Sequence, residues 1–299
     1  MDYNSSISVA DPERSANYLI DSHCHIHNTK DFDSTPEEII ARANQNGIKQ
    51  MIVIGISHED SLAAQKFAAT HANIFWSYGI HPSEAGDWAS EIADLPISGS
   101  SRQRERTRGQ TPVTTGWLPG ARDGKMQARM DKLVAIGEVG LDYHYQPYDR
   151  ETQIRLFEEI LALAQKHNLP LIFHIREAFD DFFPIVDNQH IKNAVVHSFS
   201  DSQINLEKAL DRGYYIGVNG LATFANIPLP PVERMLLETD APYLTPKPFR
   251  GKINESAYIK HIAEYLAFKL NIPLEKITEE TTKNVQVLFQ LPQPILRSA

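Results

Sequence analysis

The sequence contains a single cysteine, Cys24, among its 299 residues. One thiol excludes an internal disulfide framework and is typical of a protein from a reducing compartment. Long apolar runs are also missing, since stretches such as Met51–Ile56 fall far short of the roughly 18–20 residues that a membrane helix needs. The opening residues, MDYNSSISVADPERS, lack the apolar stretch of a secretory signal. We therefore expect a cytoplasmic protein with no membrane span.

The chain has fewer basic than acidic residues, with 29 Lys and Arg and 38 Asp and Glu, which gives a formal net charge of −9. This balance argues against a long electrostatic footprint on nucleic acid, although it permits a small, local site for phosphate chemistry. Hydrophobic residues make up 42% and charged residues 22% of the chain. Such a composition is that of a globular protein and excludes wholesale disorder or a fibrous repeat.

Eight short β-rich runs recur along the chain, each followed by a helical pattern or a connection. Most are continuously apolar, which is typical of strands buried on both faces of a parallel sheet. Alternating strands and helices predict βα units, and eight of them predict a single-domain (β/α)8 TIM barrel. An open doubly wound sheet is the main alternative, but no glycine-rich phosphate loop follows the first strand. The predicted strands are Asn17–Ile20, Lys49–Ile56, Asn73–Ile80, Leu133–Val139, Leu169–Phe173, Asn193–Val196, Gly213–Val218 and Arg234–Glu238.

Helix signals accompany these runs. Thr35, Pro36 and Glu38 form a capping box with proline at the first helical position, which predicts a helix start. Apolar residues at i, i+3 and i+4 spacing predict an amphipathic helix over Glu151–His167. A similar spacing around Ile262 predicts another helix late in the chain.

Two segments break the alternation. Residues 96–125 are rich in Ser, Thr, Gly, Pro and Arg, and they predict an inserted mobile loop just before the fourth strand. Between residues 219 and 234, three prolines oppose a full helix, so we expect a shortened unit after the seventh strand. The expected organisation is an N-terminal lead over residues 1–16, a barrel over 17–292 and a tail over 293–299.

Polar residues of metal-binding type follow five of the predicted strands. Side chains alternate along a strand, so His23 and His25 should point the same way, with Cys24 opposite. In a parallel barrel the carboxyl ends of all strands meet at one rim, where barrel active sites form. The candidate metal ligands are His23, His25, Glu138, His174, His197 and Asp240.

Imidazole and carboxylate groups together suit zinc, manganese or similar divalent ions. Six ligands are too many for one catalytic zinc and suit two ions about 3.5–4 Å apart, which would lower the pKa of a bound water toward about 7. Glu138 is the natural bridging ligand, and Asp240 could both hold an ion and take the proton of the attacking water. His27 lies beyond the strand end and is a candidate supporting group.

Seven blocks of the sequence resemble the TatD family of metal-dependent deoxyribonucleases, in order from about Tyr18 to Leu291. The resemblance implies a (β/α)8 barrel with two divalent ions (Mg, Mn or Zn) that hydrolyses phosphodiester bonds in DNA, commonly from an end. It carries the metal roles onto the same six residues. The blocks are Asp21–His25, Gly79–Pro82, Ile136–Tyr143, Phe173–Ala178, His197–Ser200, Glu238–Leu244 and Arg250–Glu255.

Cationic donors beside the metals should help to bind the phosphate, because phosphodiester cleavage adds negative charge to its oxygens. Tyr143 and Tyr243 are candidates for stacking on a base. Arginines of the 96–125 insertion could attract single-stranded DNA, although a solvated loop is the simpler interpretation. The candidate substrate-binding residues are His81, Arg176, Arg250 and Lys252.

The resemblance thus implies a DNA-cleaving enzyme that acts exonucleolytically on single strands or frayed ends. A binuclear hydrolase of a small phosphoester, lactone or amide is the alternative on the same barrel, because fold does not fix substrate. A catalytically inactive binding module is a third reading, against which the intact ligand set speaks. The sequence leaves open the native metal, the preference for DNA or RNA, exonucleolytic or endonucleolytic cleavage, and the oligomeric state.

Overall fold

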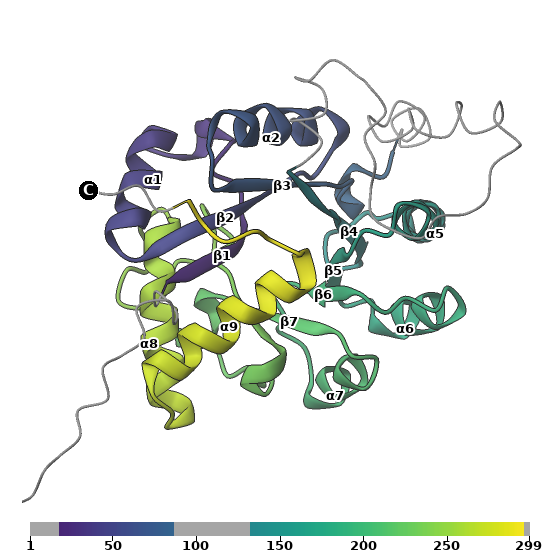
Figure 1. Ribbon diagram of the computed structural model, residues 1–299. Helices are drawn as coiled ribbons and strands as arrows, with labels where there is room; N and C mark the ends of the chain where they lie inside the picture. The colour runs from purple at the N-terminus through teal and green to yellow at the C-terminus, as the bar shows by residue number, and fades with distance from the viewer. Residues whose placement is uncertain (1–17, 87–131, 296–299) are drawn as a thin grey trace, which may run out of the picture.

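A computed structural model describes residues 18–86 and 132–295 of the chain (Figure 1). The predicted N-terminal lead and the predicted insertion at residues 96–125 lie outside the described residues, as does the end of the predicted tail. Within the described part, no helix is both long and apolar enough to cross a membrane.

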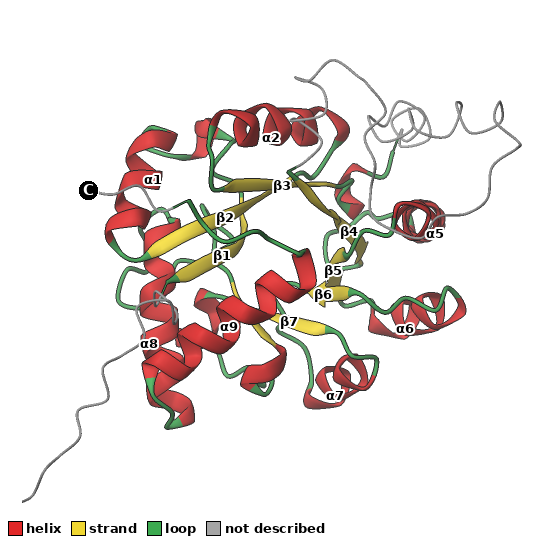
Figure 2. Cartoon of the chain, in the orientation of Figure 1, coloured by secondary structure: helices red, strands yellow, loops and turns green. Residues whose placement is uncertain are grey.

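Eight parallel strands form one sheet in which each strand pairs with the next along the chain (Figures 1 and 2). All eight predicted strands are present, and the apolar runs are buried as expected for a barrel covered by helices. The strands are β1 (Leu19–Cys24), β2 (Ile48–Ile54), β3 (Ile74–Tyr78), β4 (Leu133–Asp142), β5 (Leu171–Arg176), β6 (Ala194–Val196), β7 (Tyr215–Val218) and β8 (Met235–Leu237).

The barrel closes between β1 and the residues that follow β8. A parallel bridge joins Cys24 to Ala241. The backbone N–H of Asp240 donates to the carbonyl of His23 at 2.9 Å, and that of His25 donates to the carbonyl of Ala241 at 2.8 Å. This seam sets Asp240 beside the two histidines of β1.

Helices surround the barrel where the sequence predicted them (Figure 2). The predicted capping box is confirmed, because the Thr35 side chain accepts from the Glu38 N–H while the Glu38 carboxylate accepts from the Thr35 N–H. The helix predicted over Glu151–His167 is α5. The α-helices are α1 (Pro36–Gln45), α2 (His58–Thr70), α5 (Arg150–His167), α6 (Phe179–Asn188), α7 (Gln203–Asp211), α8 (Ile259–Leu270) and α9 (Leu274–Phe289).

The unit after β7 is shortened as predicted. Only two 3-10 turns, Gly220–Thr223 and Val232–Arg234, occupy the fully described connection between β7 and β8. Proline cannot donate the backbone hydrogen bond that a continuing helix requires, and Pro228, Pro230 and Pro231 lie in this segment.

Helix α9 lies across one end of the barrel (Figure 1). Its Val285, Leu288 and Phe289 pack in one buried apolar cluster with inward-facing strand residues such as Ile52 and Phe75. This cluster fills the barrel interior on the side where the strands begin. Polar chemistry is therefore confined to the opposite end, at the carboxyl ends of the strands.

Candidate metal centre

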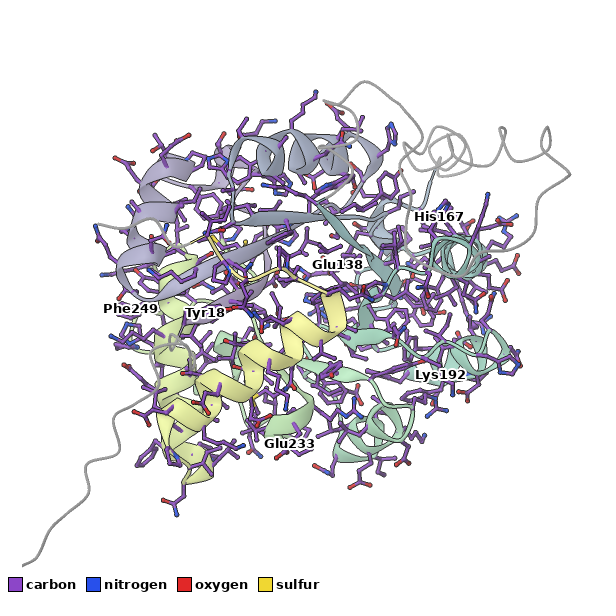
Figure 3. All side chains as sticks on the ribbon, viewed as in Figure 1. Tyr18, Glu138, His167, Lys192, Glu233 and Phe249 are labelled. Atoms are coloured by element: carbon purple, nitrogen blue, oxygen red, sulfur yellow. The ribbon has the colours of Figure 1, made fainter. Side chains whose placement is uncertain are left out.

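Glu138, from β4, lies near the middle of the ring of strands (Figure 3). Its Oε1 atom is 2.7 Å from His197 Nε2 and 2.8 Å from His174 Nδ1. Its Oε2 atom is 3.4 Å from His23 Nε2. The two oxygens of one carboxylate thus face different strands of the barrel.

Asp240 completes the side of the centre that faces β1. Its Oδ1 atom is 3.4 Å from His25 Nε2 and 3.6 Å from His23 Nε2. The structure therefore brings all six predicted metal ligands together. Two of the three-residue groups that could hold an ion, each with its ligand atoms within 4.8 Å of one another, are His23–His25–Glu138 and Glu138–His174–His197.

Local backbone geometry explains how these side chains converge. The pairing of β1 with β2 shifts register between Asp21 and Cys24. At this end of β1, His23 and His25 face the centre, while Cys24 packs in the apolar layer outside the barrel. Gly79 allows β4 to approach closely, since a Cβ atom there would lie 2.2 Å from the Glu138 nitrogen. Asp240 has a φ of +57°, a strained conformation of the kind found at functional sites.

Two of the histidines are oriented by hydrogen bonds through the ring nitrogen that faces away from the centre. His25 Nδ1 lies 3.1 Å from the Ile54 carbonyl, which only accepts, so this nitrogen carries the proton. His174 Nε2 lies 2.9 Å from Asp142 Oδ2 and donates to it in the same way. With an ion bound, each ring would present its other nitrogen, unprotonated, to that ion, as a metal ligand must.

His197 is backed by a second buried carboxylate. Glu238 Oε1 lies 3.5 Å from His197 Nδ1. The same oxygen accepts from the backbone N–H of Ser198 at 2.7 Å and from Asn219 Nδ2 at 3.2 Å. Gly217 makes room for this carboxylate, because a Cβ atom there would lie 2.2 Å from Glu238 Oε2.

His23 shows that the site suits a cation. The side chain is 1% exposed, and neither ring nitrogen has a hydrogen-bond partner among the described residues. Its ring stacks on that of His197 with centroids 4.0 Å apart. A buried imidazole without partners is costly, and a metal ion at Nε2 would satisfy it. The donor set of imidazoles and carboxylates fits a divalent ion.

The carboxylates of the centre are held in the ligand form. Burial alone would raise the pKa of Glu138, but the charge of His197 and hydrogen bonds from His174 and His197 hold that pKa well below its usual range. Burial likewise opposes ionisation of Asp240, yet its hydrogen bond with His25 keeps the pKa of Asp240 below the ordinary value. Both groups are ionised at neutral pH.

His81, predicted to bind substrate, lies at the edge of the centre. Its Nε2 atom is 3.8 Å from Glu138 Oε1, while its Nδ1 atom accepts from the Ser83 N–H at 3.1 Å. Burial, helped by the charge of His174, lowers the pKa of His81 to about 4. The ring is therefore neutral, with an N–H at Nε2 available to donate.

The three predicted cationic substrate residues lie further out. Arg176 follows His174 by two residues on β5 and donates from Nη1 to the Tyr145 hydroxyl at 3.1 Å. Beyond β8, the Arg250 guanidinium packs 4.0 Å from the centroid of the Phe224 ring. Lys252 follows in the same loop and is exposed.

The supporting carboxylates Asp142 and Glu238 had no role assigned from sequence. The sequence did contain a signal for them, because side chains an even number of residues apart on extended chain point to the same side. Glu238 precedes Asp240 by two residues, and Asp142 follows Glu138 by four. His27 contacts Asp60 at 3.1 Å, so it supports the loop after β1 and touches none of the six ligands within hydrogen-bond range.

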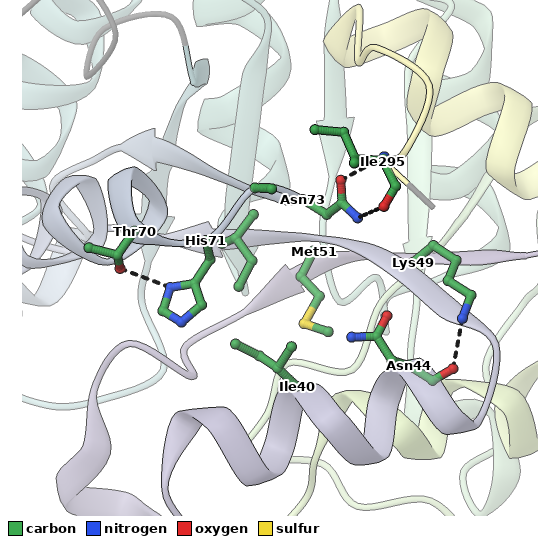
Figure 4. Close-up of a pocket in the computed structure, with 10 residues that line it drawn as sticks. Ile40, Asn44, Lys49, Met51, Thr70, His71, Asn73 and Ile295 are labelled. Atoms are coloured by element: carbon green, nitrogen blue, oxygen red, sulfur yellow. Dashed lines mark hydrogen bonds between the residues drawn. The ribbon is translucent and has the colours of Figure 1, made fainter. Parts of the chain in front are cut away.

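A cavity of about 440 Å³ lies elsewhere, between α1, α2 and the start of β3 (Figure 4). Its lining includes Ile40, Met51, His71 and Ile74. None of the six converging residues contributes to it, so the candidate centre is the site at the carboxyl ends of the strands.

Comparison with known proteins identifies the family of the chain. The family model described as "TatD related DNase" matches residues 20–290. The chain belongs to the TatD family. It is 31% identical over 282 residues to the "uncharacterized metal-dependent hydrolase YabD" of Bacillus subtilis, covering 91% of this chain and 99% of that protein.

Other TatD relatives carry more specific names. The "3'-5' ssDNA/RNA exonuclease TatD" of Pantoea ananatis is 30% identical over 275 residues, covering 87% of this chain and 95% of that protein. The solved structure of YJJV, a TatD homologue from Escherichia coli, is similar at a TM-score of 0.75 with 26% identity, covering 92% of this chain and 98% of that one. The resemblance seen in the sequence blocks is thereby confirmed, and the TatD barrel with it.

Proposed function

We propose that this TatD protein is a divalent-metal-dependent nuclease that cleaves phosphodiester bonds in DNA, acting from an end of a single strand or a frayed duplex. The observation that carries the proposal is the placement of Glu138. Its two oxygens face two separate groups of histidines, as a bridging ligand between two ions requires.

In this proposal the six converging residues divide between two Mg, Mn or Zn ions. His23, His25 and Asp240 would hold one ion and His174 and His197 the other, with Glu138 offering a carboxylate oxygen to each group. Such ions supply Lewis acidity toward phosphate oxygens and make a bound water acidic near neutral pH.

The chain's own groups then manage protons and charge. Asp240 accepts the proton of the attacking water on its carboxylate, which is ionised at neutral pH. His81 donates from Nε2 to a phosphate oxygen, where negative charge increases during the reaction. Arg176, two residues beyond His174, supplies positive charge on the same side of the barrel.

Free cations around the rim support a phosphodiester substrate. Among the described residues, Arg176, Arg250 and Lys252 form no ion pair with a carboxylate, whereas Arg150 and Arg212 are each paired with an aspartate at 2.6 Å. A guanidinium or ammonium group without an acidic partner is available for phosphate. The net charge of −9 favours contact with few phosphates, which suits engagement of a strand end.

End-labelled oligonucleotides test this function. The full chain should degrade a single strand stepwise from one end with Mg²⁺, Mn²⁺ or Zn²⁺, and chelation should stop the reaction. His23→Ala should abolish the activity, while His167→Ala, which removes an imidazole from the last residue of α5, should retain it. Hydrolysis of a chromogenic small phosphoester or lactone without any cleavage of oligonucleotides would overturn the proposal in favour of a small-molecule hydrolase.

A further inference from the structure

Exposed aromatic rings are rare in the described part of the chain. Among its Phe, Tyr and Trp side chains only Tyr145, Tyr243 and Phe268 are more than half exposed, at 67%, 57% and 85%. Phe268 lies near the end of α8. The two tyrosines instead follow β4 and β8, at the strand ends where the metal centre lies. An exposed aromatic ring beside a functional site offers a face on which a ligand can stack.

Tyr243 stands next to the part of the centre built on β1. Its ring centroid is 6.4 Å from that of His25, with the two planes at 62°. Its backbone is fixed on both sides, since its N–H donates to the Asp240 carbonyl and its carbonyl accepts from Asn254 Nδ2. The ring is thus exposed on a rigid segment close to the ligands.

Tyr145 stands beside the other part of the centre, where β4 and β5 end. Arg176 covers one face of its ring, with the guanidinium carbon 4.9 Å from the ring centroid, and donates to its hydroxyl. The edge of the ring meets His144, which pairs with Glu177 at 2.7 Å. These contacts hold the ring in place while most of its surface is exposed.

The two rings lie on opposite sides of the centre, because β4 and β8 are four strands apart in an eight-stranded barrel. We propose that Tyr145 with Arg176, and Tyr243, are two stacking platforms for the nucleobases on either side of the scissile phosphate. This inference rests on the proposed nuclease function and sharpens its substrate class. A base is free to stack on a side chain when it is released from its neighbours, so the substrate is a single strand or an opened end.

The test combines deletion of a ring with deletion of a base. kcat/KM is measured for wild type, Tyr145→Leu and Tyr243→Leu on three single-stranded oligonucleotides: one intact, one lacking the terminal base and one lacking the penultimate base. Each leucine variant should lose roughly 5- to 150-fold on the intact strand, the range for one base–aromatic stack. On the strand that lacks its partner base, kcat/KM of the same variant should be less than about twofold below that of wild type, since the stack is already absent.

Two further variants separate stacking from other effects. Tyr145→Phe keeps the ring, so its kcat/KM should fall as much as that of wild type when the partner base is removed, although it loses the hydroxyl that accepts from Arg176. Phe268→Leu, at the third exposed aromatic, should match wild type on all three strands. If a leucine variant lowers kcat/KM by the same factor on the intact strand and on the strand that lacks its partner base, the stacking inference is wrong, while the nuclease function still stands. A wild-type protein that cleaves a chromogenic ester but no oligonucleotide would overturn both.

Discussion

Replacing Asp142 by asparagine isolates the contribution of a supporting carboxylate to the metal centre. In the structure Asp142 Oδ2 accepts from His174 Nε2 at 2.9 Å, and its Oδ1 accepts from the His144 N–H at 2.9 Å. Burial would raise the pKa of Asp142, but the hydrogen bond from His174 holds that pKa below its ordinary value. The ionised carboxylate therefore fixes His174 with Nδ1 directed toward Glu138 in the centre.

The expected magnitude follows from this single hydrogen bond. A bond from a ring N–H to a carboxylate contributes about 1.5–3 kcal/mol, and a neutral amide oxygen retains roughly half of it. The remaining loss is about 0.75–1.5 kcal/mol, or roughly 4- to 13-fold in ion affinity. If the amide presents its NH₂ group instead, His174 is forced into the wrong tautomer, and the loss approaches the roughly 100-fold upper end for such supporting residues.

Calorimetric titration of the full chain with Mn²⁺ measures the effect. Asp142→Asn should bind one ion roughly 4- to 100-fold more weakly than wild type, with the other ion less affected because His23, His25 and Asp240 are unchanged. The matched control is Asp180→Asn, an exposed carboxylate in the first turn of α6. If the two asparagine variants titrate alike, Asp142 does not orient a metal ligand and the reasoning is wrong.

Three predictions concern stability and are read from urea unfolding. Lys132→Met should lower the free energy of unfolding by about 1–3 kcal/mol, because Nζ donates to the carbonyls of Ala68, His71 and Ala72 at the end of α2; an unchanged midpoint would contradict this. Leu288→Ala should cost about 2–4 kcal/mol by opening a cavity where α9 fills the barrel, and a loss below about 1 kcal/mol would show that α9 is dispensable. The hydrogen bond from Arg150 lowers the pKa of Asp181 in the folded protein. The stabilisation of the fold by this ion pair is therefore present above the unfolded pKa near 3.8 and is lost as pH falls through the folded value. Asp181→Asn should therefore have a lower free energy of unfolding than wild type at pH 7, and this difference should shrink below about pH 4. A difference that does not depend on pH would refute the ion pair.

The fold was predictable because its signals are local and repeated. Continuous apolar runs identify buried parallel strands, and the prolines between residues 219 and 234 identify the shortened unit. The six ligands were predictable because strand ends meet at one rim, so residues far apart in sequence converge without knowledge of side-chain contacts.

Other features depend on packing that the sequence does not display. The approach of Asp240 to His25 follows from the seam between β1 and the segment after β8. The spacing along the strands already pointed to Asp142 and Glu238, but their partners, His174 and His197, come from the distances in the structure. The cytoplasmic location stays a prediction.

Metal stoichiometry of wild type and Glu138→Gln tests the central claim most directly. The account predicts that the wild-type chain binds two divalent ions, since Glu138 belongs to both ligand groups of the centre. Glu138→Gln should bind fewer than two ions at the same free concentration and should lose nuclease activity while remaining folded by circular dichroism. A wild type that saturates at one ion, or a Glu138→Gln variant that binds two ions with wild-type affinity, would contradict the account.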